Sequence, residues 1–361
     1  MAERKDRSAL KVQKGVPQPS SVNEQERNRI ISSKRRLLTA EEYFAGIRSG
    51  SRALFSQAIT LIESTLPEHQ DISQEIIELC LPYSGNSFRI GITGVPGVGK
   101  STFIDSFGMH LIGQGHRVAV LAVDPSSGRS KGSILGDKTR MEDLSRSEEA
   151  FIRPSPSAGS LGGVARKTRE SIVVCEAAGF DVILVETVGV GQSETAVHGM
   201  VDFFLLLMLA GAGDELQGIK RGIMEMCDAI FINKADGSNR TKAEAARVEY
   251  SNALHLFPAS PSGWTPTAGV CSAMTRDGIP DVWETMQQYK TFTTENGYFN
   301  RKREEQNLLI IRETVSEQLL SHFYHHESVS RLLAELEKLV KEQKLSAYQA
   351  ARRLTDAYFN P

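Results

Sequence analysis

Residues 88–102, FRIGITGVPGVGKST, decide the fold of this chain. The apolar run Phe88 to Ile92 predicts a buried strand, and the residues from Gly94 to Ser101 fit the phosphate-loop pattern G-x-x-x-x-G-K-[ST]. Glycines let a backbone turn tightly and present successive N–H groups to an anion, and the helix that opens behind the loop adds its dipole. Strand, loop and helix together predict a site for a nucleoside triphosphate.

The pattern gives each residue of this loop an expected role. The residues expected to contact the nucleotide are Gly94, Val95, Pro96, Gly97, Val98, Gly99, Lys100, Ser101 and Thr102. Lys100 is expected to reach the β- and γ-phosphates, and the Ser101 hydroxyl to ligate Mg²⁺. A chance match to the pattern is the alternative, and the strand before the loop and the helix after it argue against that alternative.

A second motif, Asn233-Lys234-Ala235-Asp236, follows the predicted strand Asp228 to Ile232 and has the N-K-x-D pattern of guanine-specific proteins. The Asp236 carboxylate is suited to accept hydrogen bonds from the N1–H and the exocyclic amino group of guanine, a donor pair that adenine lacks. We expect Asn233 to brace the loops, the Lys234 stem to lie along the base, and backbone N–H groups of Cys271-Ser272-Ala273 to close the pocket. A strand-end turn rich in Asn and Asp is the alternative interpretation.

The composition indicates a globular enzyme without special affinity for nucleic acid or membranes. The 361 residues carry a formal net charge of −2 and 40% hydrophobic residues, enough for a sizeable core. The longest strongly apolar run, Phe203 to Ala210, is far too short to span a bilayer. Four cysteines lie in apolar sequence without C-x-x-C spacing, which is typical of buried thiols in a reducing compartment. With no secretory segment near Met1, we expect a cytoplasmic protein.

Four segments are expected along the chain. Residues 1–36 hold ten basic and four acidic residues and few large hydrophobic ones, which predicts a disordered basic arm over 1–38. A mitochondrial transit peptide, and hence the matrix, is the alternative, although acidic residues are unusual in such peptides. Residues 39–84 have helical periodicity and are expected to pack beside a P-loop GTPase domain over 85–292, and residues 293–361 predict a helical tail.

Within the central segment, apolar strands alternate with amphipathic stretches. This alternation predicts a doubly wound, mainly parallel sheet with helices on both faces, which is the P-loop NTPase form of the α/β class. The expected strands are Phe88 to Ile92, Arg117 to Val123, Val182 to Glu186, Phe203 to Leu209, Ala229 to Asn233 and Thr267 to Cys271. Ligands on such a sheet bind at the carboxyl ends of the strands, which is where the motifs above are placed.

The tail carries two apolar stripes that must be buried. One stripe contains Leu308, Ile311, Val315 and Leu319, and the other contains Val329, Leu332, Leu333, Leu336, Leu339 and Val340. They are expected to pack against the main domain or, as the favoured interpretation, against a second copy of the chain in a dimer. His322, His325 and His326 lie in the same tail and are expected to be solvated, with metal ligation as the alternative.

Three carboxylates are expected at positions suited to bind Mg²⁺ or a water molecule. Asp124 and Glu186 stand at predicted strand ends, and Asp137 stands in the run Gly136 to Arg140. A cation bound to phosphates needs only one or two carboxylates besides the phosphate-loop hydroxyl, so not all three are expected to be direct ligands. Helix capping is the alternative for Asp124 and Asp137.

Glu186 begins the run Glu186-Thr187-Val188-Gly189-Val190, where most switch GTPases have D-x-x-G followed by a water-orienting Gln. Val190 has no group that orients water, so hydrolysis is expected to be slow unless another residue or a partner supplies that group. Gln192 lies close by in the sequence and can orient the water in place of that glutamine only if the Gly189-to-Gly191 segment refolds.

Several runs together resemble the MeaB/ArgK family of G proteins, the metallochaperone-type GTPases associated with adenosylcobalamin-dependent methylmalonyl-CoA mutase. The runs are 94–102, 123–127, 132–141 (GSILGDKTRM), 186–194 (ETVGVGQSE) and 213–220 (GDELQGIK), and the resemblance covers about Thr39 to Pro361. It implies a GTPase that binds GTP or GDP with Mg²⁺, gates cofactor delivery to a B12 mutase, helps expel damaged cofactor and forms a homodimer through its C-terminal helices. No bound cobalamin is expected in the isolated chain, and the adenosyltransferase is a further candidate partner.

The resemblance also implies roles for single residues. Lys100, Asp124, Asp137 and Glu186 are implied to be catalytic, and Ser101 with the same three carboxylates to be tied to the metal. Residues 211–220 resemble the family's third switch, and the implied switch and partner-signalling residues are Gly189, Gln192, Asp214, Gln217 and Lys220. An ordinary Gly-rich loop is the alternative for residues 211–220.

Two rival functions stay open at this point. A nickel-inserting GTPase usually displays Cys-Pro-Cys or His-rich metal sites, which this sequence lacks, and metal titration separates it from a mutase chaperone. A transport-associated kinase needs a phosphoryl acceptor site that nothing in the sequence marks.

Overall fold

The computed structural model describes residues 37–123, 140–154, 161–187, 193–211 and 221–359. The chain divides into two units, residues 1–39 and 40–361, and all that follows concerns the second. The predicted basic arm therefore lies almost wholly outside the described residues.

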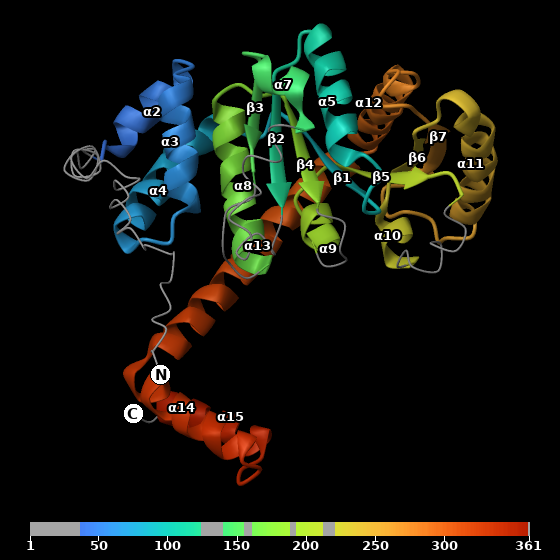
Figure 1. Ribbon diagram of the computed structural model, residues 1–361. Helices are drawn as coiled ribbons and strands as arrows, with labels where there is room; N and C mark the ends of the chain where they lie inside the picture. The colour runs from blue at the N-terminus through green and yellow to red at the C-terminus, as the bar shows by residue number, and fades with distance from the viewer. Residues whose placement is uncertain (1–36, 124–139, 155–160, 188–192, 212–220, 360–361) are drawn as a thin grey trace, which may run out of the picture. The chain divides into compact units, whose positions relative to one another are not determined.

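A seven-stranded sheet with strand order β3-β2-β4-β1-β5-β6-β7 forms the centre of this unit (Figure 1). Every strand pairs in parallel with its neighbours, which confirms the predicted P-loop NTPase fold. The strands are β1 Phe88–Gly94, β2 Val118–Val123, β3 Ala150–Arg153, β4 Val182–Thr187, β5 Phe203–Leu209, β6 Ala229–Asn233 and β7 Thr267–Val270. β3 was not among the predicted strands, because it has only four residues and lies at the sheet edge.

Alternate residues of the strands pack on opposite faces of the sheet, as the two-residue period of a strand requires. On one face, Phe88 and Phe203 join the same apolar cluster as Phe107 of α5 (Lys100–Gly113) and Trp283 of α12 (Ile279–Glu295). On the other face, a Cβ atom on Gly91 would lie 3.0 Å from side-chain atoms of Val197 and Val201, so α9 (Ser193–His198) packs closely against β1. The sheet is thus covered on both faces, and β1 lies in its middle.

The remaining helices of the central segment connect the strands. They are α7 Glu142–Arg146, α8 Leu161–Ala177, α10 Arg221–Met226, the short 3₁₀ helix η4 Gly237–Asn239 and α11 Arg240–Leu254.

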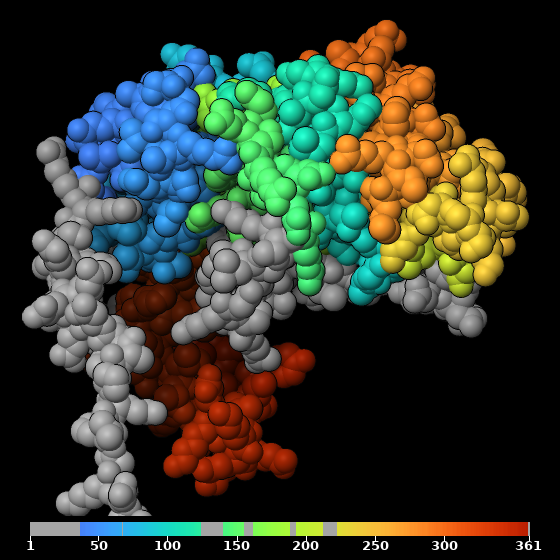
Figure 2. Space-filling view, turned by 45° about the horizontal axis from the view of Figure 1, so that its top comes forward, coloured from blue at the N-terminus to red at the C-terminus, as the bar shows by residue number. Residues whose placement is uncertain are grey.

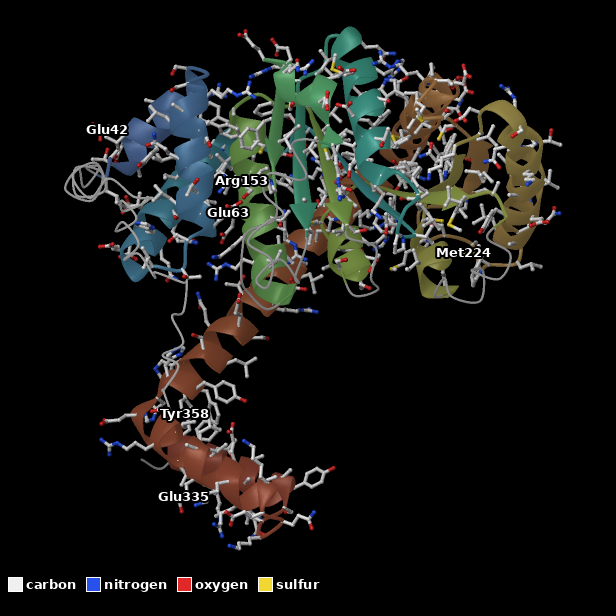
Figure 3. The ribbon with its side chains drawn as sticks, viewed as in Figure 1. Glu42, Glu63, Arg153, Met224, Glu335 and Tyr358 are labelled. Atoms are coloured by element: carbon white, nitrogen blue, oxygen red, sulfur yellow. The ribbon has the colours of Figure 1, made fainter. Side chains whose placement is uncertain are left out.

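Three N-terminal helices, α2 Ala40–Arg48, α3 Arg52–Glu63 and α4 Pro67–Cys80, are followed by the 3₁₀ helix η1 Leu81–Tyr83. They lie against the part of the chain that contains β3 and α8 (Figure 2). Glu63 and Arg153 point toward each other across this contact, and Arg153 Nε donates to Glu63 Oε1 at 2.9 Å (Figure 3). Arg52 Nη2 also donates to the Ala150 carbonyl at 2.8 Å. These contacts attach the N-terminal helices to the edge of the sheet.

The tail consists of α13 Tyr298–His325, α14 Glu327–Lys341 and α15 Ala347–Phe359. The predicted stripe on α14 packs within the chain, because Val329 and Leu336 are buried together with Ala350 and Leu354 of α15. The stripe on α13 is different: Leu308, Ile311, Val315 and Leu319 are 58%, 61%, 48% and 60% exposed. No helix among the described residues is long and apolar enough to cross a membrane.

Candidate functional site

The loop of residues 94–99 follows the carboxyl end of β1 at the middle of the sheet and leads into α5. Gly97 and Gly99 have φ angles of 78° and 91°, in the left-handed region that favours glycine. A Cβ atom on Gly99 would also lie 3.2 Å from the Asn233 amide nitrogen. The glycines therefore provide both the tight turn and the close approach of a second loop.

Lys100 stands at the first turn of α5, and its Nζ atom donates to the Gly94 carbonyl at 2.9 Å, across the mouth of the loop. Burial lowers the pKa of Lys100 below its usual range, and the negative charges of Glu186 and Glu194 oppose that shift. Glu194 lies in the first turn of α9 and is 2% exposed. Sequence reasoning gave Glu194 no role, because nothing in its spacing shows that it lies near Lys100.

Ser101 and Glu186 are brought together from α5 and β4. The Ser101 hydroxyl donates to Glu186 Oε1 at 3.3 Å. A hydroxyl and a carboxylate are hard oxygen donors of the kind Mg²⁺ selects, so this pair fits a nucleotide-bound magnesium ion. Asp124 and Asp137, the other predicted metal residues, lie outside the described residues.

The end of β6 places the predicted base-reading residues beside the phosphate loop. Asn233 is 1% exposed; its side-chain amide donates to the Val98 carbonyl at 2.9 Å, and its Oδ1 accepts from the Ala273 N–H at 3.1 Å. Lys234 Nζ donates to the Gly97 carbonyl at 2.8 Å. The Ser272 hydroxyl donates to Asp236 Oδ2 at 2.6 Å. Asn233 thus holds two loops together, and Ser272 orients the carboxylate of Asp236.

The predicted switch and partner-signalling residues are not in the described part of the chain. Gly189, Gln192, Asp214, Gln217 and Lys220 all fall in the ranges 188–192 and 212–220. Their roles stay predictions.

The histidines of the tail have polar neighbours of their own. His322 Nδ1 lies 2.8 Å from the Tyr358 hydroxyl, and His326 Nδ1 lies 2.8 Å from the Ser328 hydroxyl. Among the described residues, no group of three or more His, Cys, Asp or Glu side chains is arranged to hold a metal ion.

Comparisons with known proteins agree on one family. Residues 55–328 match the family described as "Methylmalonyl Co-A mutase-associated GTPase MeaB", a range that contains the phosphate loop, the N-K-x-D motif and residues 271–273. "GTPase ArgK" of Escherichia coli (strain K12) is 47% identical over 318 residues, 88% of this chain and 96% of that protein. "Methylmalonic aciduria type A homolog, mitochondrial" of Mus musculus is 44% identical over 328 residues, 88% of this chain and 79% of the mouse protein. The crystal structure of a protein named LAO/AO transport system kinase matches with a TM-score of 0.70 and 41% identity, over 89% of this chain and 98% of that one.

Proposed function

Because this chain belongs to the MeaB family of methylmalonyl-CoA mutase-associated GTPases, we propose that it is a GTP-hydrolysing chaperone of an adenosylcobalamin-dependent acyl-CoA mutase. Methylmalonyl-CoA mutase is the proposed client, whose cofactor loading the chain gates and which it protects or reactivates. The family match carries this proposal, since it spans residues 55–328 and includes both nucleotide motifs.

The described residues support the nucleotide chemistry of this proposal. Lys100 would leave the Gly94 carbonyl and bind the β- and γ-phosphates, while Ser101 and Glu186 would hold Mg²⁺. Mg²⁺ held by these two side chains would supply positive charge that offsets the charge developing on the phosphate groups. Asp236, oriented by the Ser272 hydroxyl, would accept the two donors of guanine. GTP and GDP are therefore the proposed ligands.

The hydrolysis step is proposed to be slow in the isolated chain. Val190 occupies the position at which other switch GTPases have a glutamine that orients the attacking water. A mutase that stabilises the closed switches would accelerate the step, and linkage then requires the nucleotide to change the affinity for the mutase in return. Asp214, Gln217 and Lys220 are the proposed signalling residues.

We also propose a homodimer through α13, because its apolar stripe of Leu308, Ile311, Val315 and Leu319 is about half exposed or more in the single chain. A variant with glutamate at both position 311 and position 319, Ile311→Glu/Leu319→Glu, is expected to raise the dimer dissociation constant by about 100-fold or more. Two charged side chains would then have to be buried in an apolar contact. Sedimentation at several concentrations measures this, with Gln349→Glu, at an exposed position of α15, as the control. Equal dimer content in the Ile311/Leu319 variant and in the control would refute an interface on this stripe.

Affinity purification from a native extract tests which enzyme is the client of this chain. The chain, immobilised with GDP or with a non-hydrolysable GTP analogue, is expected to retain a cobalamin-containing mutase in one nucleotide state more than in the other. Assay of the bound fraction for cobalamin and for acyl-CoA mutase activity identifies the partner. Retention of nickel-enzyme precursors without cobalamin would instead support the nickel-inserting alternative.

A further inference from the structure

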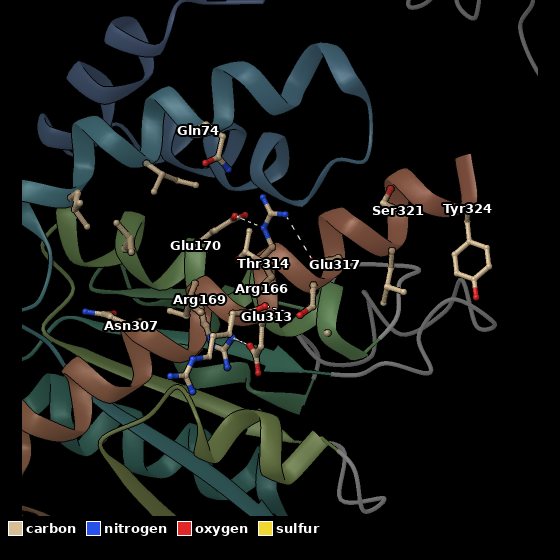
Figure 4. Close-up of a pocket in the computed structure, with 18 of the residues that line it drawn as sticks. Gln74, Arg166, Arg169, Glu170, Asn307, Glu313, Thr314, Glu317, Ser321 and Tyr324 are labelled. Carbon is tan, nitrogen blue, oxygen red and sulfur yellow. Dashed lines mark hydrogen bonds and ion pairs between the residues drawn. The ribbon is translucent and has the colours of Figure 1, made fainter. Parts of the chain in front are cut away.

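Two adjoining cavities lie where α13 passes α4 and α8. The larger has a volume of about 900 Å³ and the smaller a volume of about 160 Å³. Figure 4 shows the larger one, with Asn307 and Tyr324 toward its two ends along α13. The two cavities share the lining residues Leu81, Arg169, Val173, Asn307 and Ile310. We call the larger cavity the α13 groove and the smaller one its polar end.

The surface that lines the α13 groove is mainly apolar. Ile77 of α4, Leu81 of η1, Val173 of α8 and Ile310 and Leu320 of α13 contribute to it. Leu81 and Leu320 are 60% and 58% exposed, so apolar surface is left uncovered there. The stretch from Ile310 to Tyr324 spans about 21 Å of helix at 1.5 Å a residue. An elongated apolar cavity with a few placed polar groups is typical of a small-molecule site.

Among the described residues, three arginines and no acidic residue line the polar end. Arg89 donates to both oxygens of the Glu176 carboxylate, from Nε at 2.9 Å and from Nη2 at 3.1 Å. Arg303 binds the Asp202 carboxylate in the same way, from Nε at 2.8 Å and from Nη2 at 2.7 Å. Both carboxylates are 1% exposed, so the two pairs are fixed, because separating them would leave buried charges without partners.

Arg169, the third arginine, differs from the other two at the same edge of its guanidinium group. Its side chain is 10% exposed, and its Nε atom is buried without a hydrogen-bond partner in the described part of the chain. Its Nη2 atom lies beside Gly199 of the polar end, where an added Cβ atom would be 3.6 Å away. The ion pair with Glu313, which is half exposed, uses Nη1 instead. The edge that binds a carboxylate in Arg89 and Arg303 therefore lacks an acceptor at Nε in Arg169.

Gln306 is a second polar group of the polar end with unused hydrogen-bonding capacity. Its Nε2 atom donates to the Val201 carbonyl at 2.9 Å, whereas its Oε1 atom is buried without a partner among the described residues. A polar cavity of about 160 Å³ has room for a carboxylate together with a water molecule. Such a water would donate to Gln306 Oε1 and to the bound carboxylate.

The groove does not compete with the surface proposed for the dimer. Ile310 lines the groove, and Leu319 belongs to the exposed stripe of α13. The two residues are nine positions apart, which is about 180° around a helix of 3.6 residues per turn. The groove and the stripe thus lie on opposite faces of α13, so one copy of the chain can use both.

We propose that the α13 groove binds an amphipathic carboxylate of the fatty-acid class. The carboxylate lies on the Nε–Nη2 edge of Arg169, and the hydrocarbon chain extends along the groove toward Tyr324. Charge and shape favour this ligand, because a buried guanidinium donor without an acceptor adjoins a long apolar cavity. The inference concerns a different site from the phosphate loop and goes beyond the proposed GTPase function.

Palmitate and its methyl ester, which has the same chain and no charge, test this proposal. Displacement of a fluorescent fatty acid from the full-length chain, without nucleotide, measures both affinities. The wild type is expected to bind palmitate about tenfold or more tightly than the ester, and Arg169→Gln to lose that preference. Arg166→Gln is the matched control and keeps the preference, since it removes another arginine of the groove and its pairs with Glu170 and Glu317.

Leu320→Glu tests the position of the chain at an exposed site that tolerates the substitution. It is expected to weaken both ligands by about tenfold, because a charge would stand in the apolar part of the groove.

Four results would overturn the proposal. They are a wild type that binds neither ligand saturably, a wild type that binds both equally, an Arg169→Gln protein that weakens both by the same factor, as a structural role would, and a Leu320→Glu protein with wild-type affinity. Labelled GTP is titrated into the same samples, and loss of its binding in the wild type would count against the GTPase function alone.

Discussion

Replacing Lys100 with alanine is expected to lower single-turnover GTP hydrolysis by about 100- to 1000-fold, the size of effect seen when one charge-stabilising donor is removed from a transition state. In the structure, the ammonium group lies at the mouth of the phosphate loop, held by the Gly94 carbonyl at 2.9 Å. Lys234 Nζ also donates to this loop, at the Gly97 carbonyl, but its stem is proposed to lie along the base. The rate constant is measured by rapid quench at saturating nucleotide and Mg²⁺.

Lys242→Ala, at an exposed position of α11, is the matched control for the loss of one lysine. Thermal melting without nucleotide shows that both variants are folded. A Lys100→Ala protein that hydrolyses GTP at the wild-type rate would remove Lys100 from the catalytic site.

Replacing Asp236 with asparagine is expected to lower GTP affinity by about 100-fold or more, because two hydrogen bonds to a charged acceptor are lost or inverted. Xanthosine triphosphate presents a carbonyl where guanine has its amino group, and the asparagine amide can donate to that carbonyl, so affinity for this nucleotide is expected to rise. Competition binding with the two nucleotides measures the change in the ratio of their affinities.

Asp277→Asn makes the same chemical change in the adjacent loop, where Asp277 is exposed and accepts from the Thr275 hydroxyl at 2.9 Å. This control is expected to keep the preference for GTP. An Asp236→Asn protein with unchanged selectivity would show that another group recognises the base.

The fold could be predicted from local sequence because most of its strands are buried, apolar runs. β5 and β6 are buried along nearly their whole length, and such runs are recognisable without knowing their neighbours. β3 was missed because Ala150–Arg153 is short, and its place at the edge depends on pairing with β2. The α14 stripe was recognised, but its partner was not, since packing on α15 depends on the turn between the two helices.

The candidate site likewise contains residues that the sequence could predict and residues that it could not. The phosphate loop and Asn233 to Asp236 are motifs whose chemistry depends on local spacing, so their residues could be named from the sequence. The buried pair of Arg303 and Asp202 could not be predicted in this way, because the two residues lie 101 positions apart in the chain and no local pattern marks them. Contacts of this kind arise from the way the sheet and helices assemble, and only the three-dimensional structure reveals them.

Steady-state GTP hydrolysis with and without a purified adenosylcobalamin-dependent methylmalonyl-CoA mutase tests the central claim most directly. The isolated chain is expected to turn over slowly, and saturating mutase to raise the rate by about tenfold or more. The same mutase should bind the GTP-analogue and GDP forms with different affinities, as linkage demands. A rate that is unchanged by the mutase, together with equal affinity for both nucleotide forms, would contradict the proposal that this GTPase serves that enzyme.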